Sequence, residues 1–105
     1  MAAGLADLGR FSEPALLILA SLAGGPKHGY AIEKDVEQFS GVRLEPGTLY
    51  GALARLEGRG WIEPLPAEDR RRPYRLTGLG VSVLRARLES VQKVATIGLG
   101  RLAGT

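Results

Sequence analysis

The fold is decided by residues 46–58, Pro-Gly-Thr-Leu-Tyr-Gly-Ala-Leu-Ala-Arg-Leu-Glu-Gly, which predict one short helix with two very different faces. Leu49, Leu53 and Leu56 follow the i, i+4, i+7 spacing of a single buried stripe. At about 100° per residue the opposite side, here called the bare face, carries almost no side chains. Its members are Gly47, Gly51, Ala54 and Gly58. Because glycine costs roughly 1 kcal/mol relative to alanine inside a helix, we interpret the bare face as a place of close approach by another molecule. A poorly optimised surface helix is the alternative.

An apolar helix is predicted upstream of this segment, after a lead-in arm formed by residues 1–11. Ser12 can cap this helix and Pro14 suits its first turn, because a helix start leaves backbone N–H groups without partners. The helix extends to about Ala23 and is apolar nearly all round. We therefore expect one side to pack into the domain and the other side to meet a partner subunit.

A second helix is predicted between a Gly-Gly-Pro break and Ser40. Ile32, Val36 and Phe39 have the spacing of its core stripe. The connection that follows, residues 41–45, is of the short kind that joins two helices meeting at a steep angle.

The residues at the start of the second helix are candidates for anion binding. Lys27 and His28 precede it, and its N-terminal N–H groups can receive a phosphate. For His28 the alternative is a partly buried side chain that holds the turn. Tyr30 is expected to pack between helices rather than to touch a bound partner.

A β-hairpin is predicted directly after the bare-faced helix. Residues 61–65 are apolar and β-prone, with Trp61 packing under the hairpin and Pro64 confining the strand to an edge or irregular pairing. Residues 73–76 form the return strand and residues 66–72 the tip. The densest positive spot of the chain lies here, with no acid among its arginines: Arg70, Arg71, Arg72 and Arg75. Charge runs are usually solvated surface, but beside a bare helix face this one favours a polyanion as partner.

The last helix is predicted to begin at Thr77, whose hydroxyl can cap it, and to extend through about Leu102. At 1.5 Å per residue its length is on the order of 38 Å, too long for so small a domain to cover. Its apolar residues follow a 3-4 spacing that is typical of two-helix packing. With Leu16 and Leu19 of the first helix, they are the expected homodimer interface: Val81, Leu84, Leu88, Val91, Ala95 and Leu102.

Composition limits the alternatives. The chain has 105 residues, 45% of them apolar, and a formal net charge of +3, which indicates one small domain of the kind that a second subunit often completes. It has one histidine and no cysteine, so we expect no metal site, no cofactor and no enzyme activity. The longest apolar stretch, residues 15–23, is far short of the roughly 20 residues that a membrane span needs. We expect a cytoplasmic protein with no membrane partner.

Three short helices, a hairpin and a long final helix, in this order, indicate a winged helix-turn-helix. The expected fold class is mainly α with a small β-hairpin. Residues 1–76 are expected to form the DNA-binding domain with its N-terminal arm, and residues 77–105 the dimerisation helix of the same compact unit. In this arrangement the third helix enters the major groove of double-stranded DNA, and the hairpin lies along the backbone.

The sequence also resembles a known family, the PadR-type bacterial transcription regulators. The matching stretches span most of residues 14–84; they are residues 25–32 (Gly-Pro-Lys-His-Gly-Tyr-Ala-Ile), residues 46–50, residues 53–57, Gly60, Ile62, and residues 74–77 with Gly80. The chain departs from the family where Gly51 stands in place of a common proline and Pro73 in place of a strand former. The resemblance implies a dimeric repressor in which residues 47–50 and the hairpin arginines meet DNA. Two-fold symmetry then predicts an inverted-repeat operator.

Physical reasoning gives these residues compatible roles. Thr48 and Tyr50 can donate hydroxyls to phosphates from either flank of the bare face, and Arg55 can reach the backbone or a guanine edge. The full set of expected DNA contacts is Lys27, His28, Gly47, Thr48, Tyr50, Gly51, Arg55, Arg70, Arg71, Arg72 and Arg75. A protein-interaction module is the alternative function, since winged-helix domains also bind proteins.

An effector is the remaining partner that the resemblance raises. Some members of the family respond to phenolic acids or flat cationic drugs at or near the dimer interface. Beyond Phe11, however, the expected dimer elements carry no aromatic side chain for stacking. A repressor without an effector, or one tuned by a small apolar molecule, fits the sequence equally well.

Overall fold

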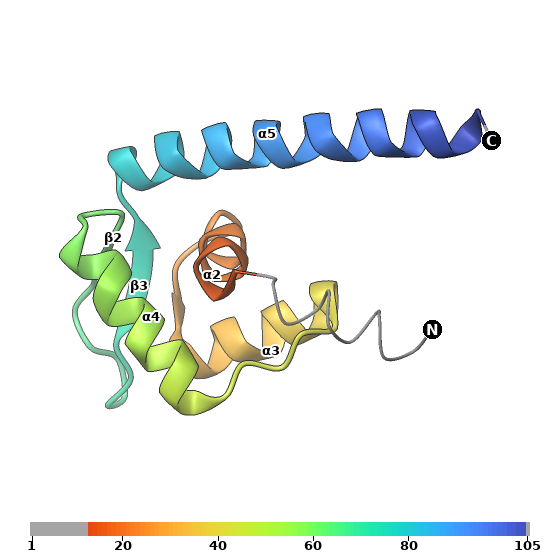
Figure 1. Cartoon of the computed structure of the whole chain (residues 1–105). Helices are drawn as coiled ribbons and strands as arrows, with labels where there is room; N and C mark the ends of the chain where they lie inside the picture. The colour runs from red at the N-terminus through yellow and green to blue at the C-terminus, as the bar shows by residue number, and fades with distance from the viewer. Residues whose placement is uncertain (1–12, 105) are drawn as a thin grey trace.

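The computed structural model describes residues 13–104, and Figure 1 shows the arrangement of its helices and strands. The elements are α2 (Pro14–Leu22), β1 (Lys27–His28), α3 (Gly29–Ser40), α4 (Pro46–Gly58), β2 (Ile62–Pro64), β3 (Pro73–Leu76) and α5 (Gly78–Ala103). The described residues form a winged helix-turn-helix, as the sequence predicts, mainly α with a small sheet. The predicted arm and the Ser12 cap lie outside the described residues.

The helix α2 is the centre of the core. Pro14 occupies its first turn, and Ile18, Leu19 and Leu22 are buried. It contacts α3, α4, β3 and α5, so its own chain surrounds it on several sides (Figure 1). The prediction that Leu19 faces a partner subunit is therefore wrong, because this side chain is 3% exposed inside the core of its own domain. Leu16 is half-buried and packs against the same core.

The helix-turn-helix pair consists of α3 and α4. Ile32 and Val36 of α3 are buried as predicted, but the prediction for Phe39 is wrong, since 51% of it is exposed. Leu44, in the connection between the two helices, supplies a buried side chain that the sequence pattern did not predict. The leucine stripe of α4 is buried as predicted, and α4 packs against α2 and α3.

The strands in the described part of the chain form a three-stranded antiparallel sheet in the order β1-β3-β2, rather than the predicted two-stranded hairpin. On one side of β3, Ile62 of β2 pairs with Leu76. On the other side, His28 of β1 pairs with Pro73. A strand of two residues is too short to show an alternation of apolar and polar positions, so periodicity could not reveal β1. Its pairing ties the start of α3 to the hairpin.

Only the first turns of α5 pack on the domain. Thr77 caps the helix, since its hydroxyl accepts the backbone N–H of Gly80 at 3.0 Å. Gly80 and Leu84 are buried, so the prediction that Leu84 lies on an open dimer seam is wrong. From residue 85 to residue 104 every position is exposed, and the helix projects past the other described elements (Figure 1). Within residues 13–104, no helix is both long and apolar enough to cross a membrane.

Candidate nucleic-acid interface

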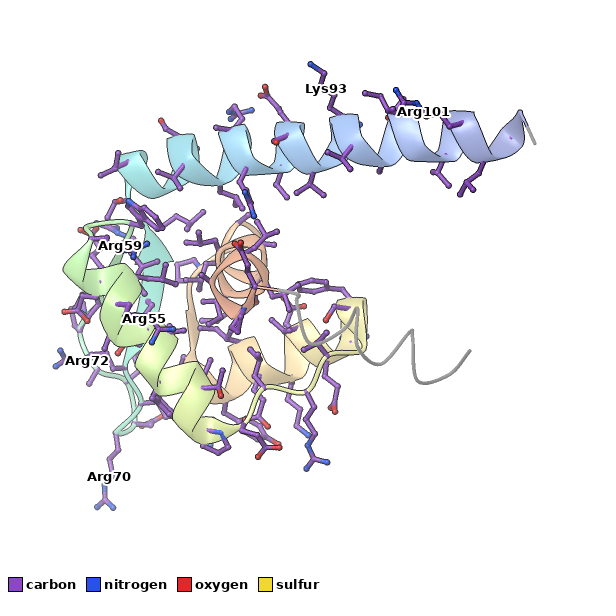
Figure 2. The ribbon with its side chains drawn as sticks, viewed as in Figure 1. Arg55, Arg59, Arg70, Arg72, Lys93 and Arg101 are labelled. Carbon is purple, nitrogen blue, oxygen red and sulfur yellow. The ribbon has the colours of Figure 1, made fainter. Side chains whose placement is uncertain are left out.

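The bare face of α4 is open. A Cβ added at Gly47 or Gly58 would meet no described atom within 4 Å, and one added at Gly51 would meet only Nη1 of Arg55, at 3.6 Å. The Arg55 guanidinium therefore lies beside Gly51 on this side of the helix, where Figure 2 labels it. Thr48 and Tyr50 are exposed as well. The helix presents a smooth surface with one long cationic side chain next to it.

The hairpin formed by β2, β3 and residues 65–72 between them, here called the wing, ends in a tight turn. Glu68 and Arg71 exchange two backbone hydrogen bonds of 2.7 and 2.8 Å. Between them, Asp69 and Arg70 have φ angles of 48° and 68°. Two-residue hairpin turns with two positive φ angles prefer Asn-Gly or Asp-Gly, so an arginine in the second position is held at a cost of roughly 1 kcal/mol. The side chain of Arg70 points away from the body at the wing tip (Figure 2).

Arg70→Gly is expected to stabilise the protein and weaken DNA binding at the same time. Glycine relieves the left-handed backbone, so the free energy of unfolding should rise by about 0.5–1 kcal/mol. The loss of one cation at the wing tip should lower the affinity for duplex DNA several-fold. Thermal melting and a fluorescence-anisotropy titration on the same variant measure the two effects.

The matched control is Asp69→Gly at the other position of the same turn. It also relieves a positive φ angle, but it removes a negative charge. Aspartate is already a preferred residue at the first position of this turn, so we expect little change in stability, with an unchanged or higher DNA affinity. Equal losses of affinity in both variants would show that turn flexibility, and not the charge of Arg70, affects binding.

A hollow of about 300 Å³ lies where the start of α3, one residue of α4 and the wing meet. Tyrosine rings and guanidinium groups make up most of its lining. The lining residues are His28, Gly29, Tyr30, Tyr50, Arg70, Arg71, Arg72 and Tyr74. Among these described lining residues none is acidic. The hollow therefore gathers hydrogen-bond donors and positive charge from segments far apart in the sequence.

Tyr30 belongs to this group, and the prediction that it packs between helices is wrong. It is 55% exposed, with Nζ of Lys34 5.4 Å and the guanidinium carbon of Arg71 6.0 Å from its ring centroid. Its ring also stacks on His28, with the centroids 6.5 Å apart. Helical geometry could have placed it, because the two residues from Tyr30 to Ile32 correspond to about 200° around a helix. Tyr30 therefore lies nearly opposite the buried stripe.

Two predicted DNA contacts are instead engaged within the fold. Nζ of Lys27 donates to the backbone oxygen of Ser21 at 2.6 Å and lies 4.0 Å from the carboxylate of Asp35. Nε of Arg75 is 2.5 Å from Oε1 of Glu63, on the neighbouring strand β2. The structure does not bring Lys27 or Arg75 into the hollow. No acid lies among these arginines along the chain, but the neighbouring strand β2 supplies Arg75 with a carboxylate partner.

The open surface of α5 is apolar along much of its length. Four of the predicted seam residues are exposed on it, namely Val81, Leu88, Val91 and Ala95. Leu102 is also exposed, near the end of the helix. A groove of about 460 Å³ runs between α5, Ala23 and Leu76, and no aromatic side chain is among its described lining residues. This groove offers aliphatic contact but no stacking partner for a flat effector, so the effector stays an expectation.

Within residues 13–104, no group of three or more histidine, aspartate or glutamate side chains is placed to hold a metal ion. The hollow itself is lined by hydroxyl, imidazole and guanidinium groups, all of which can bind phosphate oxygens.

A comparison with protein families identifies the winged domain. The model of the transcriptional regulator PadR-like family matches residues 18–86, which is most of the chain. This chain belongs to the PadR-like family. The PadR-like family is one of DNA-binding transcriptional regulators and not of enzymes, in agreement with the prediction from the sequence.

The PadR-like chain has relatives of known sequence and structure. A protein of Streptomyces fradiae, described as an uncharacterized 37.1 kDa protein in transposon TN4556, is 45% identical over 86 residues, which cover 82% of this chain. The chain spans a quarter (25%) of the length of that relative. The crystal structure of a PadR family transcriptional regulator from Eggerthella lenta is 32% identical with a TM-score of 0.73, covering 99% of this chain and 92% of the other. A PadR family regulator from Clostridium difficile is 26% identical with a TM-score of 0.74, covering 82% and 94%.

Two PadR-like motif glycines lie where separate segments of the chain touch. A Cβ added at Gly29 would be 2.7 Å from the hydroxyl oxygen of Tyr50, so the tyrosine of α4 lies directly across the first turn of α3. A Cβ added at Gly80 would be 1.9 Å from the backbone oxygen of Trp61. The first glycine therefore lets Tyr50 reach the hollow, and the second joins α5 to the start of the wing.

Proposed function

We propose that this chain is the operator-binding part of a transcriptional repressor that binds double-stranded DNA as a homodimer. The observation that carries the proposal is the hollow in which α3, Tyr50 of α4 and three wing arginines meet without an acidic residue among the described lining. Cationic and hydroxyl groups thus lie next to the bare face of α4. One continuous surface can serve the major groove and the phosphates that flank it.

The helix α4 enters the major groove with its bare face. Gly47 and Gly51 let the helix backbone come close to the base edges. Arg55 lies beside Gly51 and is the long side chain available there; arginine can make two hydrogen bonds to a guanine or one to a phosphate. Thr48 and Tyr50 donate to phosphates at the edges of the groove, while the wing arginines follow the backbone and contribute charge without reading bases.

The open length of α5 joins two copies of the chain. An exposed helix with apolar residues along one side buries them when it packs against a second copy. A two-fold dimer then presents two identical reading heads, so the operator is an imperfect inverted repeat with half-sites about one helical turn apart. Selection of bound fragments from genomic DNA, followed by footprinting, tests this arrangement. Protection of a single asymmetric half-site would contradict it.

Salt dependence separates DNA binding from the alternative of a protein-interaction module. Replacing Arg71 and Arg72 by alanine removes two cations, so the slope of log affinity against log salt should fall by roughly 1 to 2. Specific and random duplexes should weaken alike. Arg75→Ala is the matched control, because Glu63 already pairs with this arginine, and its effect should be smaller. Wild-type protein that binds no duplex, or binds it with little dependence on salt, would support the alternative.

Leu88→Asp is expected to yield a monomer with much weaker operator binding. Leu88 is 42% exposed on α5, so a charge there disturbs the dimer without entering the core of the domain. Analytical ultracentrifugation measures the oligomeric state, and circular dichroism confirms that the domain stays folded. Ser82→Asp is the control, since it adds the same charge about 120° around α5 from Leu88, away from the predicted seam. A Leu88→Asp protein that still sediments as a dimer would remove α5 from this role.

A further inference from the structure

The imidazole of His28 connects the helix-turn-helix to the wing. Its Nδ1 accepts the backbone N–H of Ala31 at 3.3 Å and so caps α3, which agrees with the turn-holding role considered for it. Its Nε2 lies 3.3 Å from Nη1 of Arg71 in the wing. The two contacts use opposite nitrogens of one ring, and they make different demands on the proton.

The position of the imidazole proton shows that the contact between Nε2 of His28 and Arg71 lacks an acceptor. A neutral imidazole carries a single N–H, so a ring that accepts at Nδ1 has its proton on Nε2. Every N–H of the Arg71 guanidinium is a donor, and arginine does not lose its proton in proteins. At the joint between α3 and the wing, two donors therefore face each other. An acceptor that bonds to both groups at once would satisfy them, and an anionic acceptor would also balance the charge of Arg71.

The surroundings favour an anion on one side of this pair. The hollow described above lies there, with Tyr30 and Tyr50 in its wall. The ring of Tyr30 stacks on His28, and the Arg71 guanidinium carbon lies 6.0 Å from its centroid, so the three groups lie close together at the hollow. His28 and Arg71 also line a second hollow, and it is there that the acidic residues of the wing tip, Glu68 and Asp69, lie, together with Pro26, Lys27 and Pro73.

We propose that His28 and Arg71 bind one and the same phosphate of the DNA backbone, in the hollow between α3 and the wing. The inference rests on the proposed function and names one of its contacts. Nε2 of His28 and the guanidinium of Arg71 donate to the phosphate oxygens, while Nδ1 continues to cap α3. Because one phosphate is shared by two elements, it fixes the position of the wing relative to the helix-turn-helix on the duplex.

A double-mutant cycle on the operator selected as above tests the shared phosphate. His28→Asn keeps a side chain that caps helices well but removes Nε2, and Arg71→Gln removes the guanidinium. Each single change should weaken binding about tenfold, because each removes a hydrogen bond to a charged group. Since both groups hold one phosphate, the double variant should be scarcely weaker than the weaker single variant. The control cycle pairs His28→Asn with Arg55→Gln, whose losses should multiply.

Two further measurements locate the phosphate. Ethylation interference should reveal one phosphate in each half-site whose modification blocks the wild type and no longer affects the double variant. The chain has a single histidine, so one imidazole spin system in ¹⁵N NMR reports on the site directly. Free protein should show the Nε2–H tautomer. The operator duplex should shift this signal, while a duplex with a neutral methylphosphonate at that position, or millimolar inorganic phosphate, should shift it far less.

Different outcomes test the shared phosphate and the proposed function on which it rests separately. Multiplying losses for His28→Asn and Arg71→Gln, or an imidazole signal that the duplex leaves unchanged, would overturn the shared phosphate while DNA binding stands. A signal that inorganic phosphate shifts as strongly as the duplex would indicate a site for free anions rather than for the DNA backbone. A wild-type protein that binds no duplex would overturn the proposed function and the shared phosphate together.

Discussion

Gly80→Ala is expected to cost the domain several kcal/mol of stability. We expect this loss to be larger than that caused by an alanine at any other described glycine. A Cβ at this position would lie 1.9 Å from the backbone oxygen of Trp61 and 2.9 Å from its carbonyl carbon. Backbone atoms cannot rotate aside as the end of a side chain can. Either α5 or the segment before β2 must therefore move.

The carbonyl of Trp61 is held in place by its own hydrogen bonding. It accepts the backbone N–H of Thr77 at 3.0 Å, and the Thr77 hydroxyl donates to the oxygen of Gly60 at 2.6 Å. Overpacking costs about 1–3 kcal/mol, and disruption of these hydrogen bonds adds about 1–3 kcal/mol. A domain of this size has a total stability of about 5–15 kcal/mol, so Gly80→Ala should remove a large part of it.

Urea unfolding followed by circular dichroism measures the loss. Gly78→Ala is the matched control, because it adds the same methyl group in the first turn of the same helix, where no described atom lies within 4 Å. Its stability should equal or slightly exceed that of the wild type, since alanine favours the helix. A Gly80→Ala protein with the midpoint of the Gly78→Ala control would show that the junction adjusts without cost.

The helix α4 could be predicted in detail because its pattern depends on local sequence alone. Pro46 begins it, and the three leucines recur at the period of one buried stripe. The two-residue strand β1 carries no such pattern; it exists because Pro73 and Tyr74 of the wing pair with it. Pairing with a distant segment is a property of the folded chain, which periodicity cannot report.

The predicted dimer residues show a second limit of prediction from the sequence. Apolar spacing indicates that a side chain is buried, and it does not indicate which chain buries it. Leu84 and Leu88 lie one turn apart on the same side of α5, yet Leu84 is 4% exposed and Leu88 is 42% exposed. Burial of α5 against the domain stops between these two positions, although Arg87 still pairs with Glu13 at the start of α2, at 2.7 Å. The prediction for Leu19 is wrong for the same reason, because α2 is enclosed by its own chain.

For the charged residues, too, the sequence does not show which partners the fold brings to them. The sequence places a dense run of arginines on the wing, but it does not show that Glu63 of the next strand neutralises Arg75. Nor does it show that Lys27 closes the end of α2 through the Ser21 carbonyl. Counting neighbours along the chain therefore overestimates the number of free cations. The hollow with His28, Tyr30 and Arg71 appears only when three segments are brought together.

Gly51→Gln is expected to weaken DNA binding by an order of magnitude or more while leaving the fold intact or slightly more stable. A Cβ at position 51 meets only the end of the Arg55 side chain, at an ordinary contact distance of 3.6 Å. Glutamine is better than glycine inside a helix by roughly 0.5–1 kcal/mol, so the melting temperature should stay the same or rise. The free protein therefore has no steric reason to disfavour the change.

In the complex with DNA, the added glutamine side chain is expected to be sterically unfavourable. The glutamine side chain would stand on the bare face, where the helix backbone is proposed to come close to the base edges, and it would displace the Arg55 guanidinium from its place beside residue 51. Holding α4 away from the groove floor weakens every contact that depends on the depth of insertion. The wing contacts to phosphate should survive, so binding to random duplex should fall less than binding to the operator.

Gly51→Ala separates helix propensity from obstruction. Both substitutions favour the helix, but alanine adds a single methyl group to the bare face, so its DNA affinity should stay within a few-fold of the wild type. Thermal melting and an operator titration of both variants decide the matter. If folded Gly51→Gln binds the operator as tightly as Gly51→Ala does, the bare face does not approach DNA. The glycines of α4 would then favour a protein surface as the partner of this helix.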